Sequence, residues 1–323
     1  MDAHRGRIIL YAALFAIAAS DAAAQTYPAK PIRIIVGAGS GGGVDTISRI
    51  VGQRLGERWA QQIVVENRPG AGGAVASELV AKSPPDGHTL LTISISYAVI
   101  PVSHKNLGYD PIRDFTPVAV LVNGPNILVV HPSLPVKSVK DLIALAKERP
   151  GQLLYASSGN GGAANLALEA FKLATGADIV HVPYKGTAPG VIDLIAGRIS
   201  LTSAAVVSAM GYVKQGKLRA LATVGAKRAN AAPELPTVAE AGVPGYAVDV
   251  WYAMFAPAAV PTQVPAQLNG EIIKMLYTPE MKERLAVIGL EPAAEPLDKT
   301  NVYIKSEVAK WAKVVTAAKI TAQ

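Results

Sequence analysis

An apolar run, Pro31-Ile32-Arg33-Ile34-Ile35-Val36, breaks abruptly into Gly37-Ala38-Gly39-Ser40-Gly41-Gly42-Gly43-Val44-Asp45. Apolar residues then recur every three or four positions, at Ile47, Ile50, Val51 and Leu55. This pattern predicts a strand, a glycine-rich turn and an amphipathic helix. The first backbone N–H groups of such a helix have no partner within it, and they lie at the positive end of its dipole. The turn is therefore suited to bind a phosphate or a carboxylate.

Three functions are compatible with this turn. Gly37, Gly39 and Gly42 match the G-x-G-x-x-G spacing of a dinucleotide-binding loop, and Glu66 ends the next predicted strand, where a ribose-binding acid is expected. Ser40 is the centre of an A-x-S-x-G sequence, a relaxed form of the nucleophile elbow of serine hydrolases. In the third interpretation the turn is one wall of a carboxylate-binding cleft and carries out no chemistry.

The composition of the chain narrows these functions. Its 323 residues are enough for two domains with separate cores. The net charge is +7, but the lysines and arginines form no run with interleaved aromatic residues, which argues against a nucleic-acid partner. The chain has no cysteine, so neither a disulfide nor a lipid-modified N-terminal cysteine can form. No pair of His, Asp or Glu has metal-ligand spacing on a predicted helix face, and we expect no bound metal.

Residues 1–24 have the pattern of a secretory leader. Arg5 and Arg7 precede an apolar segment at 8–19, and the small residues up to Ala24 form an A-x-A cleavage signal. We therefore expect export to the periplasm with cleavage near Ala24. The alternative is a membrane anchor, but the apolar segment is shorter than the ~20 residues that a spanning helix requires.

Short apolar runs alternate with helical patterns along most of the chain, which favours an α/β fold with largely parallel sheets. Further strands are predicted at 63–65, 88–95, 127–130, 153–156, 179–184, 199–203 and 218–224. Three helices are located by their caps, because Ser138 and Thr237 each precede an acid by three residues and Pro279 follows Thr278.

Two long extended segments have no helix within them. Residues 118–130 run through Asn123-Gly124-Pro125, and residues 248–257 form the second segment. Because the two segments bracket a central block, we expect the chain to leave one domain, build a second and return. The predicted domains are 25–125 together with 250–323, and 126–249. Such a double connection permits hinge closure.

The central block contains a second turn of the same design. The predicted strand at 153–156 ends in Ser157-Ser158-Gly159-Asn160-Gly161-Gly162, and a predicted helix follows. Two amide-exposing helix starts, one in each predicted domain, can close on a single anion. Each turn alone is equally compatible with a simple strand-to-helix connection.

Seven segments together resemble one known family: 65–73 (VENRPGAGG), 85–91 (PDGHTLL), 129–135 (VVHPSLP), 155–161 (YASSGNG), 181–186 (HVPYKG), 218–222 (LRALA) and 235–242 (LPTVAEAG). The family is that of the periplasmic solute-binding proteins of tripartite tricarboxylate transport systems, also called Bug receptors (TctC family). The resemblance implies a two-domain α/β fold that is periplasmic-binding-protein-like (type II, Venus flytrap), with two crossing strands as hinge. It implies a small organic carboxylate held by residues 38–45 and 157–165, integral membrane permease subunits as partners, no cofactor and no enzyme activity. We also expect a monomer.

One three-residue segment and three single positions depart from the family pattern. Ala38-Gly39-Ser40 stands where phenylalanine and two prolines are usual, Gly162 where a serine is common, Asn165 where a histidine is common, and Ala205 where an aspartate is common. Loss of an aromatic ring and a hydroxyl predicts a roomier and less polar site, and loss of the acid removes a partner for a ligand amine. We therefore expect a bulkier carboxylate, aromatic or branched, rather than an amino acid.

The predicted ligand-binding residues are Ala38, Gly39, Ser40, Gly41, Gly42, Asp45, Ser157, Ser158, Asn160, Gly161, Gly162, Lys185 and Ala205. Asp45 is expected mainly to hold the shape of its turn, with direct ligand contact as the alternative. Lys185 either attracts the anion or is solvated. No residue is expected to be catalytic. Ser40 would need a histidine and an acid as partners, but His88 and His131 have the sequence context of turn or core residues. Too little chain precedes Ser40 for the oxyanion loop of a hydrolase. The leader argues against a dinucleotide, since nicotinamide enzymes usually stay where the cofactor is made.

Overall fold

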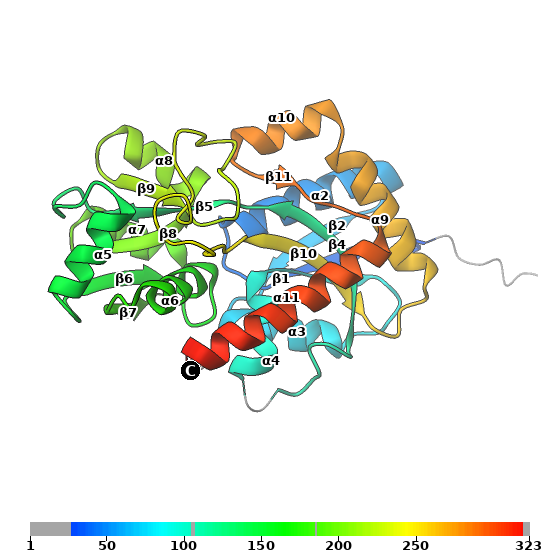
Figure 1. Cartoon of the computed structure of the whole chain (residues 1–323). Coiled ribbons are helices and arrows are strands. Elements are labelled where there is room, and N and C mark those ends of the chain that lie inside the picture. The colour runs from blue at the N-terminus through cyan, green and yellow to red at the C-terminus, as the bar shows by residue number, and fades with distance from the viewer. Residues whose placement is uncertain (1–26, 105–106, 185, 319–323) are drawn as a thin grey trace, which may run out of the picture.

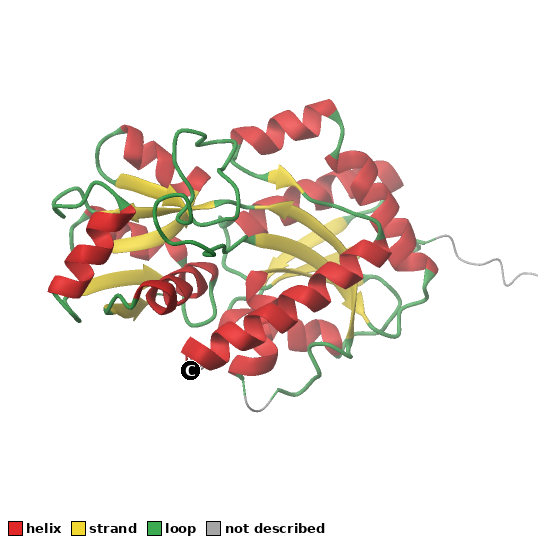
Figure 2. Ribbon diagram, viewed as in Figure 1, coloured by secondary structure: helices red, strands yellow, loops and turns green. Residues whose placement is uncertain are grey.

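The structure, a computed structural model, describes residues 27–104, 107–184 and 186–318. The predicted leader at 1–24 and Lys185 lie outside the described residues. The molecule has two lobes side by side, each built on one β-sheet with helices packed against it (Figures 1 and 2). No helix in the described ranges has the length and the apolar character needed to cross a membrane.

The first lobe contains the N-terminal elements and the C-terminal elements. Its strands are β1 (Ile32–Val36), β2 (Ile63–Asn67), β3 (Thr89–Ser94), β4 (Phe115–Asn123), β10 (Trp251–Pro257) and β11 (Glu291–Pro292). Its helices are α2 (Gly43–Trp59), α3 (Ala74–Ala81), α4 (Ile100–Ser103), α9 (Gln263–Leu276), α10 (Pro279–Val287) and α11 (Leu297–Ala318), with the short 3-10 helices η1 (Ala71–Gly73) and η2 (Ile95–Ala98). The strand order in the sheet is β11-β4-β10-β3-β1-β2.

The second lobe contains only central elements. Its strands are β5 (Asn126–Val130), β6 (Leu153–Ser157), β7 (Ile179–Pro183), β8 (Leu201–Ala205) and β9 (Arg219–Thr223). Its helices are α5 (Val139–Glu148), α6 (Ala163–Thr175), α7 (Thr187–Ile195) and α8 (Val206–Lys214). The strand order is β7-β6-β8-β5-β9, and this lobe is drawn in green in Figure 1.

Both sheets are mixed. β1 is parallel to β2 and β3, and β6 is parallel to β7 and β8, but β4, β5 and β10 are antiparallel to the strands with which they pair. The prediction of largely parallel sheets was therefore wrong. β5 and β10 each enter a lobe from the other lobe without a helical crossover, and so they run opposite to the neighbours that end at the boundary between the lobes.

The caps at Ser138 and Thr278 begin α5 and α10, as predicted. The described residues after Thr237 form turns instead of the predicted helix. Thr237 and Glu240 do complete a capping box, because Glu240 N donates to Thr237 Oγ1 (3.0 Å) and Thr237 N donates to Glu240 Oε2 (2.9 Å). Gly242 follows at φ 115°, however, and a residue with positive φ ends a helix.

The two connections between the lobes lie next to each other. The first runs from β4 through Gly124 and Pro125 into β5, and the second enters β10 from Val250. Gly124 N donates to Val250 O (2.7 Å), and Val206 N, at the start of α8, donates to Pro125 O (3.1 Å). The paired connections are the two segments that were predicted to act as a hinge between the lobes.

Candidate functional site

The first glycine turn joins β1 to α2 and is held from inside. Gly41 has a φ of 78°, and its N–H donates to Asp45 Oδ2 (2.9 Å). Gly42 is the N-cap residue and no side chain caps the helix. Asp45 is only 4% exposed, and its Oδ1 lies 2.9 Å from Arg49 Nη2. The start of α2 is therefore shaped by Asp45 and left open to an incoming anion.

Asp45 is ionised at neutral pH. Burial by itself raises the pKa of this carboxyl, but hydrogen bonds from Arg49, Gly41 and Asn67 outweigh burial and hold the pKa below its usual value. Asn67 also donates to Ala38 O (3.1 Å) and accepts from Arg49 Nη2 (3.0 Å). Asn67, the last residue of β2, thus holds the turn at Ala38 by a hydrogen bond. Sequence reasoning missed this role of Asn67, although it lies in the family-like segment 65–73.

The second glycine turn joins β6 to α6 and repeats the same geometry. Gly161 has a φ of 74°, its N–H donates to Asn165 Oδ1 (2.9 Å), and Gly162 is an N-cap without a side-chain hydrogen bond. Gly161 and Asn165 occupy the positions in this turn that Gly41 and Asp45 occupy in the first turn. The acceptor is an amide in one turn and a carboxylate in the other, so the shape of the turn does not depend on charge.

A buried hydrogen-bond network supports the second turn from behind. Asn165 Nδ2 donates to Tyr155 Oη (2.7 Å), and Tyr155 Oη donates to Glu169 Oε1 (2.7 Å). The His181 ring stacks on Tyr155 at 4.7 Å between centroids, and its Nε2 lies 2.6 Å from Ser157 Oγ. Burial lowers the pKa of His181, although the charge of Glu169 opposes the shift. The imidazole is therefore neutral at pH 7.

A third glycine-rich turn, 70–73, contacts both of the others. All four of its residues have positive φ, including the non-glycine Ala71 at 47°. A Cβ added to Gly73 would lie 3.2 Å from Gly37 O, and one added to Gly72 would lie 3.4 Å from Asn160 O. The first turn and the second turn therefore both lie against η1, although they belong to different lobes.

The predicted site residues differ in their exposure. In the first turn Ala38 is half-buried and Gly39, Ser40, Gly41 and Gly42 are exposed. In the second turn Ser158 is exposed, Asn160 and Gly162 are half-buried, and Ser157 and Gly161 are buried. Ala205 is half-buried, ends β8 and pairs with Asn126 beside the hinge. Lys185 lies outside the described residues. The structure thus brings both turns to one boundary and adds Ala205 near the hinge, but no hydrogen bond between described residues joins Ser40 to Ser158.

The two enzyme interpretations find no support in the geometry. The hydrogen-bonded serine–histidine pairs of the described residues are Ser103–His104, Ser133–His131 and Ser157–His181, and none of them includes Ser40. Glu66, the expected ribose ligand, is held by Arg33 (2.7 Å) and Arg68. Within the described ranges no three acidic, histidine or cysteine side chains gather as a metal site.

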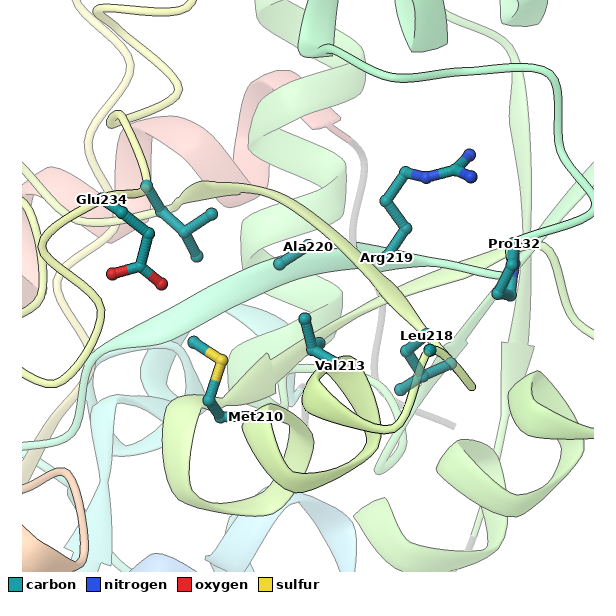
Figure 3. Close-up of a pocket in the computed structure, with 9 residues that line it drawn as sticks. Pro132, Met210, Val213, Leu218, Arg219, Ala220 and Glu234 are labelled. Atoms are coloured by element: carbon teal, nitrogen blue, oxygen red, sulfur yellow. The ribbon is translucent and has the colours of Figure 1, made fainter.

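Two hollows lie away from the turns. One of about 400 Å³ lies between α8 and β9, where the Arg219 side chain points away from Met210 (Figure 3). Arg219 Nη1 already donates to Val136 O (2.7 Å) and Leu134 O (3.2 Å). The other hollow, of about 300 Å³, lies between η2 and α11. Neither hollow is lined by a residue of the glycine turns.

Comparison with known proteins identifies the family. The model of the tripartite tricarboxylate transporter family receptor matches residues 47–320. The chain is 36% identical to protein BugT of Bordetella pertussis over 307 residues, which cover 94% of each chain. The structure resembles a protein of R. palustris solved with adipate (TM-score 0.86, 38% identity, 91% of this chain and 99% of that chain). It also resembles MatC from Rhodopseudomonas palustris with bound malate (TM-score 0.82, 28% identity, 90% of this chain and 100% of that chain).

These likenesses confirm the predicted two-domain fold of a periplasmic solute-binding protein. They also confirm that the chain is a receptor and not an enzyme, which removes the dehydrogenase and hydrolase interpretations of the first turn. The chain belongs to the tripartite tricarboxylate transporter receptor family.

Proposed function

We propose that the chain captures a small organic carboxylate between its two lobes and delivers it to an integral membrane permease. The observation that carries this proposal is that the glycine turns preceding two uncapped helix starts, those of α2 and α6, both contact η1. Helix starts favour anions, and two of them from different lobes suit a ligand that bridges the lobes. Adipate and malate, which the two solved relatives hold, are both carboxylates.

Backbone groups are sufficient to hold such a ligand. A buried carboxylate must replace the hydrogen bonds that it loses on leaving water. Each hydrogen bond to a charged group contributes roughly 1.5 to 3 kcal/mol, and each helix start adds about 0.3 to 1 kcal/mol. Micromolar binding requires about 8 kcal/mol. About four to six contacts, from turn amides and from hydroxyls such as those of Ser40 and Ser158, therefore suffice after the ordering cost.

The first turn favours a bulky ligand. A Cβ added to Gly39 or Gly41 would meet no atom within 4 Å, so this turn borders open space. Ala38 and Ser40 are small as well, and Ala205 provides no carboxylate for an amine. We therefore propose an aromatic or branched carboxylate in preference to an amino acid.

Closure of the lobes connects binding to delivery. A ligand that touches both turns binds the closed form more tightly than the open form and shifts the population toward it. The adjoining connections at Gly124 and Val250 provide the hinge. The permease then recognises the closed shape. The predicted export of the chain, with cleavage near Ala24, places it in the periplasm. There it acts as a monomer.

Calorimetric titration of the purified chain tests this proposal. We expect micromolar binding of at least one acid among adipate, malate, benzoate and 2-methylbutanoate, and weaker binding of aspartate and glutamate. The variant Ser158→Ala should weaken binding of that acid, whereas Ser208→Ala, which changes an exposed serine on α8, should not. Binding of aspartate or glutamate alone refutes the bulky ligand, and binding of no carboxylate refutes the receptor function as proposed.

A further inference from the structure

Tyr252 lies at the sheet edge that carries the first glycine turn. It is the second residue of β10, and its partner in the sheet is Ser94, the last residue of β3. β3 and β1 are parallel, so their carboxyl ends reach the same edge. Ligands of open α/β sheets bind outside this edge. Sequence reasoning did not mark Tyr252, because its position beside the turn depends on a strand that returns from the other lobe.

Two glycines confine the phenol ring of Tyr252. A Cβ added to Gly43, the first residue of α2, would lie 2.5 Å from Tyr252 Oη, and one added to Gly124 in the hinge would lie 2.7 Å from it. Because a helical Cβ points toward the N-terminus of its helix, the hydroxyl lies on the side of Gly43 where the open amides are. The hydroxyl therefore lies at the N-terminus of α2, and Gly43 and Gly124 both confine the ring there.

The Tyr252 hydroxyl has no hydrogen-bond partner among the residues that the structure describes. The residue is 5% exposed, and no group of the described chain hydrogen-bonds to it. Other tyrosines of this chain do donate to protein acceptors, namely Tyr27, Tyr97, Tyr155, Tyr184 and Tyr246. Burial raises the pKa of Tyr252 to about 12, so at neutral pH the hydroxyl keeps its proton. Because no acceptor within the described residues engages this hydroxyl, it can donate to an acceptor that arrives with the ligand.

We propose that Tyr252 is a ligand-recognition residue whose hydroxyl donates a hydrogen bond to the carboxylate bound at the start of α2. The proposal rests on the carboxylate-receptor function and extends it to a side chain of β10. A hydrogen bond to an ionised acceptor is among the stronger kinds, so this one donor contributes a large share of the affinity. Because the ring also touches Gly124, the donor is fixed at the point where the lobes join.

Titration of Tyr252→Phe tests the proposal. The wild-type chain is first titrated with adipate, malate and benzoate, and each acid that binds is then titrated into Tyr252→Phe and into the control Tyr246→Phe. Loss of one hydrogen bond to a carboxylate should raise Kd roughly tenfold or more in Tyr252→Phe. The control removes the bond from Tyr246 Oη to Ala167 O (3.0 Å) in the second lobe, and it should leave Kd unchanged.

Thermal unfolding separates recognition from folding. Tyr252→Phe removes no hydrogen bond of the described protein, so its Tm without ligand should equal that of the wild type, while the rise in Tm on adding the acid should shrink. A Kd within twofold of the wild-type value overturns the role of Tyr252 and leaves the receptor function intact. A fall in the ligand-free Tm that accounts for the weaker binding also overturns it. If the wild-type chain binds none of the three acids and also does not bind 2-methylbutanoate, the receptor function fails as well.

Discussion

Replacement of Asp45 tests whether a hydrogen bond or a charge holds the first glycine turn. In Asp45→Ala the amide of Gly41 loses its acceptor, and the guanidinium of Arg49 keeps only Asn67 Oδ1 as an acceptor. A hydrogen bond to a carboxylate is worth about 1.5 to 3 kcal/mol, and an acid in the first turn of a helix about 0.3 to 1 kcal/mol. The Arg49 pair adds little, because its side chain is 53% exposed. We expect the variant to lose about 2 to 4 kcal/mol of stability by these terms and to bind carboxylates more weakly.

Asp45→Asn is the matched control, since Asn165 fills the equivalent position in the second turn. The amide oxygen still accepts from Gly41 N, and only the negative charge is lost. We expect a loss of about 1 to 2 kcal/mol, because the helix-dipole share of about 0.3 to 1 kcal/mol is gone and a neutral acceptor makes a weaker hydrogen bond than a carboxylate does. The carboxylate affinity should be unchanged or higher, because one like charge near the anion is gone. Thermal or urea unfolding measures the stability of both variants, and calorimetric titration measures their affinity.

Two results refute this reasoning. If Asp45→Asn weakens binding as strongly as Asp45→Ala, the negative charge of Asp45, and not its hydrogen bond with Gly41, maintains the binding site. If Asp45→Ala keeps wild-type stability and affinity, the Gly41 hydrogen bond is dispensable. The pH dependence has a definite sign. The pKa of Asp45 is lower in the folded chain, so its stabilisation is complete well above about pH 3.9 and is lost as the pH falls through the folded value.

Three further predictions concern single residues, namely Gly43, Gly161 and His181. Gly43→Ala places a Cβ 2.5 Å from Tyr252 Oη, so overpacking should cost about 1 to 3 kcal/mol and lower the Tm in scanning fluorimetry; an unchanged Tm contradicts this. Gly161→Ala puts a side chain at φ 74°, which should cost roughly 1 to 2 kcal/mol in urea unfolding, whereas Gly211→Ala, in open space within α8, should be neutral or stabilising. Burial lowers the pKa of His181, so its contribution to stability is complete above about pH 6.5 and declines on acidification; His181→Gln should flatten the Tm profile between pH 7 and about pH 5, and an unaltered profile counts against this assignment.

Local patterns were enough to predict the elements but not their directions in the sheets. The run at 31–36 and the glycines after it form β1 and the first turn, because strand alternation, helical spacing and helix starts depend on neighbouring residues. The prediction of a helix after Thr237 was wrong. The capping box is present, but Gly242 adopts positive φ directly after it and no helix forms. The prediction of largely parallel sheets was wrong because β5 and β10 enter their sheets from the opposite lobe and so pair antiparallel to their neighbours.

The candidate site was predictable in its two halves and not as a whole. Each half is a glycine turn at a helix start, and each is readable from about ten consecutive residues. The contacts of Gly73 with Gly37 and of Gly72 with Asn160 were not readable, because they join segments that are far apart in the sequence. The role of Asn67 and the position of Tyr252 were missed for the same reason.

By itself, the sequence determined that this chain has two amide-exposing helix starts in an α/β framework, because backbone dihedral preferences and apolar spacing act over a few residues. Only the tertiary structure decided that the turns before these starts both contact η1 and that a tyrosine hydroxyl without a partner inside the described protein lies beside the first of them. Those placements depend on the packing of both lobes around their shared connections, and such packing is a property of the whole chain.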